Sequence, residues 1–333
     1  MITIKELAKE LSVSISTVSK ALNDNPEISE DTVKRVKELA RLRNYKPNKT
    51  AVNLKNSSTK TIGVIIPDIL NPFFAKVLLG IESQANSKGY NIITCVSQET
   101  EAKEKENLQL LADGTVDGFI LAVAEETQIN KTTQHFTDII NDGFPIVMFD
   151  RVSDAIDCDK VIIDDFDASY QATKLLIDEG RTHIVLLNYI NELSVGQLRI
   201  QGYLKALEDS AKVLEPHLIT IDKSESLDDS IKAMFSNDPK IDGIVAIDNT
   251  SGIASLNIAK SLDIKVPVKL SIIGFSSDEL LPFSYPKLST VSQNATEIGK
   301  VSVDLLVARL RDTSLEKRIE TVAFDISERD TTK

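Results

Sequence analysis

The sequence contains no tryptophan, two cysteines and three histidines, and these shortages exclude several kinds of site. The cysteines, Cys95 and Cys158, are in no metal-binding or redox spacing, so we expect free thiols. The histidines (His135, His183 and His217) are scattered, and none stands in a motif for a zinc site or a catalytic triad. No Walker loop and no Gly-x-Gly-x-x-Gly motif is present. We therefore expect no enzyme, no cofactor and no metal site.

Long apolar runs are also missing, and no segment is apolar over the length needed to span a bilayer. The first residues, Met-Ile-Thr-Ile-Lys-Glu, lack the apolar core of a signal peptide. These two features predict a cytoplasmic protein that has no membrane partner.

The net charge of −12 argues against nucleic acid as a partner only if it is averaged over the chain. Residues 1–60 contain twelve Lys and Arg against seven Asp and Glu, which leaves +5 there and −17 on the remainder. A basic module on an acidic body is typical of a nucleic-acid-binding segment. A solvated charged surface is the plainer alternative, but the charge division coincides with the motif described next.

Residues 3–22 predict two short helices separated by a tight polar turn. Thr3 and Glu6 have the spacing of a capping box, and Ser14 is placed to cap the second helix. That second helix leaves four side chains facing outward: Ile15, Ser16, Ser19 and Lys20. A braced helix with such a face can enter a DNA major groove, although an ordinary helical hairpin would show the same pattern. A third helix is predicted from Ser29 to about Asn44.

These segments and the residues that follow resemble the lactose-repressor-like (LacI/GalR) family of bacterial transcription regulators. The matching residues are Thr3-Ile4, Val13-Ser14, Thr17-Val18-Ser19, Leu22-Asn23, Tyr45-x-Pro47, Ala51-x-x-Leu54, Ile62-Gly63-Val64 and Asn71-Pro72-Phe73-Phe74. The resemblance continues to the C-terminus and covers essentially the whole chain.

The resemblance implies how the first sixty residues meet operator DNA. The positions that read bases would be Ile15, Ser16 and Lys20, and those on the phosphate backbone would be Ser14, Asn23 and Thr32. Residues 48–56 resemble the family's hinge helix, which is too short to be stable alone in water. Paired with a second copy on DNA, it would place Ala51, Leu54 and Lys55 at the minor groove, with Leu54 as the wedge.

The rest of the chain alternates short apolar runs with amphipathic helices, which predicts parallel sheets covered by helices. The first series of runs is Ile62–Ile66, Ile92–Val96, Gly118–Ala122 and Ile146–Phe149. The second is Val161–Ile163, His183–Leu187, Leu218–Ile221, Gly243–Ile247 and Leu270–Phe275. We expect an N-terminal all-α helix-turn-helix headpiece and an α/β core of two doubly wound lobes. The resemblance implies a periplasmic-binding-protein-like core whose chain crosses between the lobes near Asp159, Ser289 and Val322.

The predicted division is a DNA-binding headpiece over residues 1–46, a hinge helix and linker over 47–60, and an effector-binding and dimerisation core over 61–333. The first lobe would contain about 61–159 and 290–321, and the second about 160–289 and 322–333. For the dimer face we expect the helices that begin near Phe73 and Ser251, with apolar stripes formed by Val77, Leu78, Ile81, Ile253 and Leu256.

Candidate effector-binding residues follow the strands, where open α/β sheets bind ligands. They are Asp68, Asn71, Phe73, Phe74, Asp150, Arg151, Arg199, Asp248, Ser276 and Gln293, with Asn249 beside them. Carboxylates, amides, an arginine and an aromatic face suit a hydroxylated or anionic small molecule, either sugar-like or nucleoside- or purine-like. An Asp after a strand is also a common turn former or helix cap, and the Asn71 run can simply begin a helix. The resemblance favours effector roles most for Phe74, Asp150, Arg199 and Asp248.

One position departs from the family pattern. After Ile272-Ile273-Gly274-Phe275 the family usually has an Asp that meets sugar hydroxyls or a purine, whereas this chain has Ser276. Asp278 could take over, or the effector lacks the group that an Asp would bind. The identity of the effector therefore does not follow from the resemblance.

Taken together, the sequence predicts a ligand-responsive transcription regulator, a repressor, that binds double-stranded, pseudo-palindromic operator DNA as a homodimer. A solute-binding protein of a transport system would explain the two lobes equally well. It would leave residues 1–60 without a role, and it would require a signal peptide.

Overall fold

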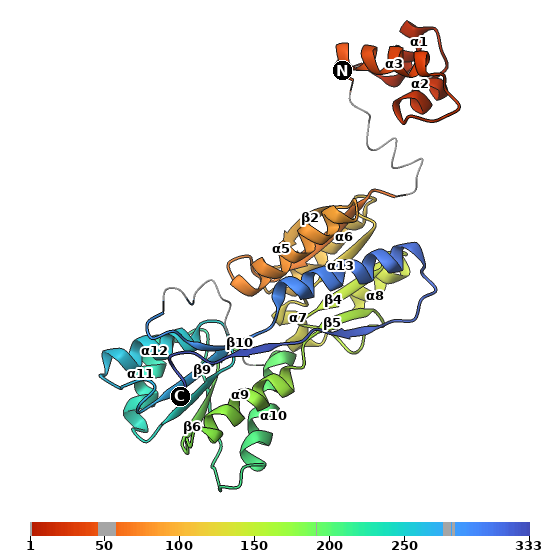
Figure 1. The fold of residues 1–333 in the computed structure, drawn as a ribbon. Coiled ribbons are helices and arrows are strands. Elements are labelled where there is room, and N and C mark those ends of the chain that lie inside the picture. Colours follow the sequence, from red (N-terminus) through yellow and green to blue (C-terminus); the bar gives the residue numbers. More distant parts are fainter. Residues whose placement is uncertain (1, 46–57, 191, 276–280, 282–283) are drawn as a thin grey trace. The chain divides into compact units, whose positions relative to one another are not determined.

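The computed structural model describes residues 2–45, 58–190, 192–275, 281 and 284–333, and it divides into two compact units, Met1–Thr59 and Lys60–Lys333 (Figure 1). Most of the predicted hinge segment lies outside the described residues, including Ala51, Leu54 and Lys55. Ser276 and Asp278 lie outside them as well. Their roles therefore stay predictions.

The first unit contains three helices, α1 (Ile4–Leu11), α2 (Ile15–Leu22) and α3 (Glu30–Leu42). The predicted capping box is confirmed: the Glu6 N–H donates to the Thr3 hydroxyl over 3.3 Å, and the Thr3 N–H donates to the Glu6 carboxylate over 2.7 Å. Ser14 and Ser29 cap the next two helices, as their positions indicated. The helices close on a small core that contains Leu7, Ala8, Val18, Ala21, Val36 and Ala40. This core fixes which side of α2 faces outward.

The second unit is built around two six-stranded sheets. The first has the order β11-β5-β4-β3-β1-β2, from β1 (Thr61–Ile66), β2 (Asn91–Val96), β3 (Gly118–Leu121), β4 (Ile146–Phe149), β5 (Asp159–Ile162) and β11 (Ile319–Thr321). The second has the order β12-β10-β9-β8-β6-β7, from β6 (Ile184–Asn188), β7 (His217–Thr220), β8 (Gly243–Ala246), β9 (Ser271–Phe275), β10 (Ser289–Ser292) and β12 (Asp325–Ser327). All recorded pairings are parallel except that of β12 with β10. The predicted parallel sheets are therefore confirmed.

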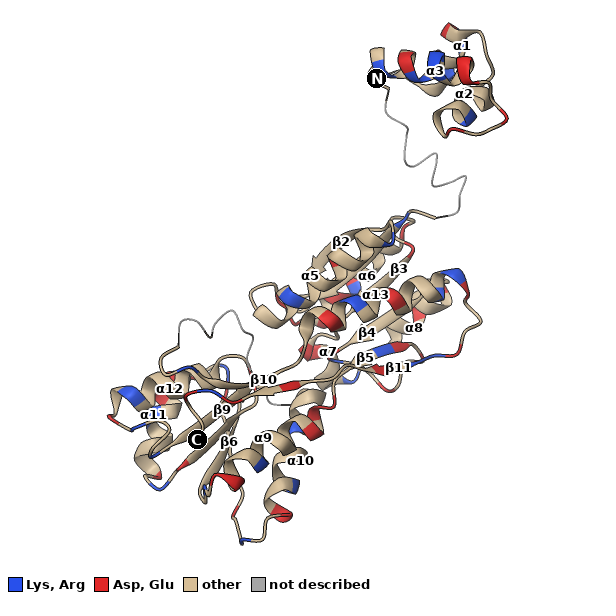
Figure 2. Ribbon diagram, in the orientation of Figure 1, with Lys and Arg blue, Asp and Glu red and all other residues tan. Residues whose placement is uncertain are grey.

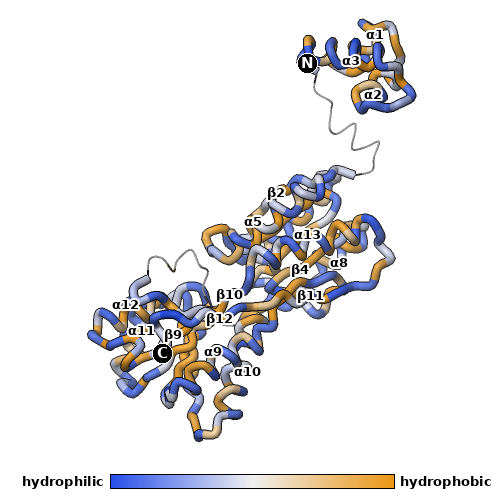
Figure 3. The backbone as a smooth tube through the Cα atoms, in the orientation of Figure 1, coloured by the Kyte–Doolittle hydropathy of each residue, from blue (hydrophilic) through white to orange (hydrophobic). Residues whose placement is uncertain are grey.

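Helices cover both faces of each sheet. They are α5 (Pro72–Ser87), α6 (Glu101–Ala112), α7 (Glu125–Asn130), α8 (Gln134–Asn141) and α13 (Ala295–Arg311) around the first sheet, and α9 (Asp165–Asp178), α10 (Ser194–Glu208), α11 (Leu227–Asn237) and α12 (Ser251–Ser261) around the second. Successive strand residues point to opposite faces, so Ile62 and Val64 pack in the cluster that contains α5 and α13, and Ile65 packs with α6 and α8. The strands β1, β3, β4, β6, β8 and β9 are accordingly apolar along most of their length (Figure 3).

Two of the predicted lobe crossings lie later than expected. The run at 161–163 was assigned to the second lobe, but β5 pairs with β4 and belongs to the first sheet. Similarly, β10 pairs with β9 in the second sheet, so the chain leaves that sheet only after Ser292. An apolar run does not state which sheet it joins, because both lobes bury such strands. The third crossing, between β11 and β12, agrees with the predicted position near Val322.

Glycines allow two pairs of helices to approach closely. A Cβ atom on Gly80 of α5 would lie 2.1 Å from the Thr296 carbonyl oxygen of α13, and one on Gly299 would lie 2.2 Å from the Val77 carbonyl oxygen. In the second lobe, a Cβ on Gly202 of α10 would lie 2.1 Å from the Phe166 carbonyl oxygen of α9. Each lobe therefore has one helix pair whose backbones pack almost directly against each other.

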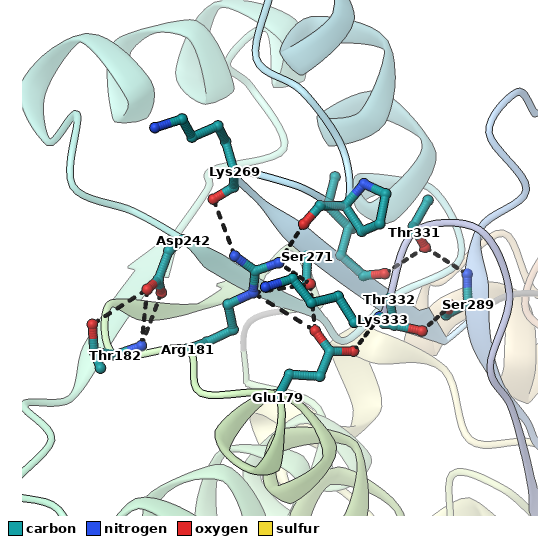
Figure 4. A network of polar contacts seen from close by, with 12 residues as sticks. Glu179, Arg181, Thr182, Asp242, Lys269, Ser271, Ser289, Thr331, Thr332 and Lys333 are labelled. Carbon is teal, nitrogen blue, oxygen red and sulfur yellow. Dashed lines mark hydrogen bonds and ion pairs between the residues drawn. The ribbon is translucent and has the colours of Figure 1, made fainter.

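The C-terminal residues are tied into the second lobe (Figure 4). The Thr331 hydroxyl donates to the Ile272 carbonyl over 2.7 Å and accepts from the Ser289 N–H over 2.7 Å. The Lys333 N–H donates to the Glu179 carboxylate over 2.6 Å. The last strand and these contacts hold β10 in place, and the chain passes from β10 to the cavity described next.

Candidate functional site

A cavity of about 390 Å³ lies between the two lobes. Nine of the ten predicted effector residues line it: Asp68, Asn71, Phe73, Phe74, Asp150, Arg151, Arg199, Asp248 and Gln293. Arg199 lies in the second turn of α10, and each of the others follows the carboxyl end of a strand or lies at the start of the next helix, so residues far apart in the sequence meet at one place. The tenth, Ser276, lies outside the described residues. The structure thus brings these side chains together, and their contacts with an effector stay predictions.

Several wall residues were missed in the sequence analysis. They are Leu70, Pro72, Glu99, Tyr189, Ile190, Leu193, Val195, Lys223 and Thr250. Glu99, Tyr189 and Lys223 follow β2, β6 and β7, so the rule about strand ends, applied to every strand rather than to some, would have found them. The apolar wall residues near α10 have no comparable signal in the sequence.

Arg199 is fixed by three neighbours in the wall of the cavity. Its Nε atom donates to Oδ1 of Asp165 over 2.7 Å, and Nη1 donates to the Ile247 carbonyl over 2.7 Å. The guanidinium carbon lies 4.0 Å from the centre of the Phe275 ring, which is within cation–π range. Arg199 can therefore offer only its remaining N–H groups to a ligand.

The other two cations of the described wall are paired in the same way. Nη1 of Arg151 donates to both carboxylate oxygens of Glu99, over 2.8 and 2.6 Å. Lys223 forms an ion pair with Glu125 of α7, across the boundary between the lobes. Carboxylates of the chain itself thus compensate all three positive charges.

Asp150 also supplies a carboxylate to the cavity, but this carboxylate forms no ion pair with one particular cation. Gln293 donates to its Oδ1 atom over 3.2 Å. Burial raises the pKa of Asp150, whereas Arg199, Arg151 and the Gln293 hydrogen bond act to lower it. Both Asp150 and Glu99 have positive φ angles, of 56° and 60°, a conformation that non-glycine residues adopt rarely and often at functional sites.

Two predicted effector residues also have the local role that the plainer interpretation allowed: Asp248 forms a turn, and Asn71 caps a helix. Oδ1 of Asp248 accepts from the N–H groups of Thr250 and Ser251 over 2.8 and 2.9 Å, at the start of α12. Its Oδ2 accepts from the Ser251 hydroxyl. Asn71 caps α5 by accepting from the Phe73 N–H over 3.0 Å. Asp248 therefore has little free acceptor capacity for a ligand.

Direct contacts join the lobes at the edge of the cavity. Nδ2 of Asn249 donates to Oδ1 of Asn71 over 3.0 Å. Gln128 of α7 donates to the Ser194 hydroxyl over 3.0 Å and accepts from the Ser194 N–H over 3.2 Å. Both sets of bonds would break if the lobes separated, so they belong to the closed arrangement of the cavity.

An aromatic cluster forms one side of the cavity. The Phe73 and Phe74 rings meet edge to face, with centroids 5.3 Å apart, and the Arg151 guanidinium carbon lies 5.2 Å from the Phe74 centroid. Both rings are buried, Phe74 almost completely. They line the cavity with rings of fixed orientation, of which little surface is exposed.

In the headpiece, the outward face of α2 contains the three predicted base-reading residues. Ile15 is 44% exposed, and Ser16 and Lys20 are exposed as well. Lysine and arginine occur on all three helices of this unit (Figure 2). The predicted backbone contacts, Ser14, Asn23 and Thr32, lie at the start of α2, just after α2, and in the first turn of α3. The surface therefore has a protruding apolar residue, small hydroxyls and a cation, which suits a DNA groove.

The predicted dimer stripes are wrong for three of their five residues. Val77, Ile81 and Leu256 are buried in the cores of the lobes and cannot face a second copy. The apolar spacing that suggested an interface instead packs α5 and α12 on their own sheets. On α5, Leu79 is the large apolar residue that stays exposed, at 62%.

Comparisons with known proteins find matching families for both units. Residues 3–48 match the family described as "Bacterial regulatory proteins, lacI family", and residues 59–323 match "Periplasmic binding proteins and sugar binding domain of LacI family". The second match alone covers more than half of the chain. The chain belongs to the lacI family of bacterial regulatory proteins. It is a ligand-binding transcriptional regulator.

Individual members of the lacI family match along nearly the whole length. The chain is 31% identical over 335 residues to the HTH-type transcriptional regulator RegA of Clostridium saccharobutylicum, covering 99% of each chain. It is 31% identical over 326 residues to the HTH-type transcriptional repressor PurR of Aliivibrio salmonicida, covering 96% of this chain and 95% of that one. Among solved structures, a LacI family regulator from Enterococcus faecium with bound ribose is 26% identical, with a TM-score of 0.71, covering 82% and 98% of the two chains.

The described part of this lacI-family chain shows neither a metal-binding cluster nor a membrane-spanning helix. Within it, no group of three or more His, Cys, Asp and Glu side chains is arranged to hold a metal ion. No described helix combines the length and the apolar character that crossing a membrane requires.

Proposed function

We propose that the chain is a homodimeric repressor whose affinity for a pseudo-palindromic operator depends on a small polar effector bound between the lobes. The observation that carries this proposal is the cavity, in which residues from seven separate segments of both lobes meet. A cavity at the boundary of two lobes allows a ligand to bind one relative arrangement of the lobes better than another, which is the requirement for allosteric control.

The headpiece reads the operator through α2. Lys20 contacts a guanine edge and Ile15 a thymine methyl group, with Ser16 beside them. Ser14, Asn23 and Thr32 position the module on phosphates. One headpiece reads only a half-site, so a second copy is required. Residues 47–60 connect headpiece and core, and Ala51, Leu54 and Lys55 contact the minor groove when two hinges pair.

The effector is an uncharged polar molecule of the sugar or nucleoside class. Carboxylates of the chain already compensate the three cations of the described wall. Asp150, Gln293 and Asn249 supply acceptors and donors suited to hydroxyl groups or ring nitrogens. Phe73 and Phe74 supply the apolar face. The ribose bound to the Enterococcus faecium relative is consistent with this class.

The chain acts in the cytoplasm, without a cofactor, and it is not an enzyme. Its relatives RegA and PurR are transcriptional regulators. The functional division is a headpiece over 1–46, a hinge over 47–60 and a core over 61–333, with the lobe limits moved so that β5 belongs to the first lobe and β10 to the second.

A thermal-shift screen of sugars, sugar acids and nucleosides tests the effector site. We expect at least one neutral sugar or nucleoside to raise the melting temperature of the wild type. Gln293→Ala should reduce that shift, because it removes an amide from the cavity, whereas Gln171→Ala on α9 should not. An equal shift in all three proteins would place the ligand elsewhere.

Operator binding and assembly need separate measurements. Selection of bound sequences from random duplexes should yield a sequence with two related, inverted half-sites. Light scattering at micromolar concentration should give the mass of a dimer. A monomer or a tetramer as the main species would contradict the homodimer.

A further inference from the structure

Asp165 and Arg199 form a buried ion pair beside the cavity. Besides the Nε bond, Nη2 of Arg199 lies 2.7 Å from Oδ1 of Asp165. The Arg199 and Asp165 side chains are 5% and 3% exposed. Arg199 lines the cavity, and Asp165 is its buried neighbour at the first residue of α9, directly after the chain crosses between the lobes. The pair therefore joins the cavity wall to a crossing segment.

Two adjacent aspartates at this crossing have different tasks. Oδ1 of Asp164 accepts from the Asp167 N–H over 2.8 Å, so Asp164 caps α9 and stays exposed. Asp165 is not required for the cap, and its carboxylate is held where burial disfavours the charge, which raises its pKa to about 6. A buried carboxylate kept next to a ligand cavity at such a cost indicates a role in the site.

The other contacts of Arg199 orient it but do not neutralise it. The Ile247 carbonyl and the Phe275 ring carry no net charge. Without Asp165 the guanidinium would keep free N–H groups at the cavity wall, and the remaining carboxylate that acts on it, Asp150, has no hydrogen bond to it. Such a group binds sulfate, phosphate or carboxylate ligands, because its planar donors match their oxygens.

We propose that Asp165 is a positioning residue that sets the effector specificity of the cavity. It neutralises Arg199 and holds the guanidinium as a hydrogen-bond donor for an uncharged effector, so that the cavity rejects anions. This inference rests on the proposed function, because it concerns the same cavity, and it explains how a site that contains arginine can select a neutral ligand.

Sulfate is a suitable probe because it keeps two negative charges across the accessible pH range. Calorimetric titration of the full-length chain at pH 7.5, with ionic strength held constant by chloride, should show no saturable sulfate binding to the wild type. Asp165→Asn should show saturable sulfate binding at concentrations where the wild type shows none. Asp167→Asn is the matched control, since it removes a carboxylate from the same turn outside the ion pair, and it should behave like the wild type. The double variant Asp165→Asn with Arg199→Met should lose the new binding.

Equal sulfate affinity of Asp165→Asn and Asp167→Asn would overturn the proposal, as would sulfate binding that survives Arg199→Met.

If Asp165→Asn does not fold, the wild type at pH 5 gives the same test, because protonated Asp165 no longer neutralises Arg199. The charged groups that face Asp165 are Arg199 from α10, Asp150 after β4 and Asp164 before α9. Asp150→Asn should therefore retain the gain in sulfate binding at pH 5, and loss of the gain would assign it to Asp150. Failure to bind an operator would refute the proposed function without changing any of these results.

Discussion

The charge of one buried side chain, Asp165, makes the stability of the core depend on pH. Burial raises its pKa from 3.8 to about 6. The folded chain therefore binds this proton more tightly than the unfolded chain, and the contribution to the free energy of unfolding falls as pH rises from about 4 to 6. Each pKa unit corresponds to about 1.4 kcal/mol, so the loss is at most about 3 kcal/mol.

Asp165→Asn removes this titration. We expect the free energy of unfolding of the variant, relative to the wild type, to rise by up to about 3 kcal/mol between pH 4 and pH 7.5. Urea denaturation of both proteins at the two pH values measures the difference. A difference that stays the same at both pH values would show that the carboxyl of Asp165 does not have a raised pKa.

In the headpiece, Lys20 has a well-matched control. Lys20 pairs with Glu27 and is 46% exposed, while Lys37 pairs with Asp24 and is 45% exposed. Lys20→Ala should reduce discrimination between operator and random DNA by about 1–3 kcal/mol, if Lys20 reads a guanine. Lys37→Ala should leave discrimination unchanged. Fluorescence anisotropy titrations with operator and random duplexes measure this discrimination. A uniform loss of affinity on all sequences would make Lys20 a phosphate contact.

At the scale of helices and strands, the close helix pairs make a prediction about glycine. Gly80→Ala and Gly299→Ala each place a methyl group against a backbone carbonyl, at 2.1 and 2.2 Å, so the helices must separate. We expect a loss of about 1–3 kcal/mol or more in the free energy of unfolding. Gly252→Ala on α12 is the control, because its nearest neighbour is a Leu288 side-chain atom at 3.2 Å. Equal losses for all three would show that helix contact is not the cause.

The elements themselves could be predicted from the sequence because their signals are local. The caps at Thr3, Ser14 and Ser29 and the apolar runs of β1 and β8 each depend on a few neighbouring residues. The sheet that a strand joins depends on distant pairing, which is why β5 was assigned to the wrong lobe. The dimer stripes were wrong for the same reason. The spacing of Val77 and Ile81 in the sequence is the same whether the two side chains face a core or a partner.

The candidate site was predictable to a similar depth. Strand ends located Asp150 and Arg199, because topology places all such ends at one edge of each sheet. The pairing of Arg199 with Asp165 could not be predicted, since the two residues are 34 positions apart and only the packed lobes bring them together. The turn that Asp248 forms with Thr250 and Ser251 was predicted only as a general alternative to ligand binding.

For the molecule as a whole, effector control requires that the cavity and the operator site influence each other. Contacts such as Asn71 with Asn249, and Gln128 with Ser194, hold the lobes together, and an effector that touches both lobes changes the balance between arrangements. Coupling between two such sites typically amounts to about 1–3 kcal/mol, which changes affinity by about 5- to 150-fold.

The most direct test is operator affinity measured by fluorescence anisotropy with and without a saturating amount of the ligand found in the thermal-shift screen. We expect a change of at least about fivefold for the wild type, in either direction. At the same ligand concentration, Asp150→Asn should bind the operator with one affinity in both conditions, because the cavity has lost its unpaired carboxylate. Equal operator affinity of the wild type with and without bound ligand would show that the effector does not control operator binding.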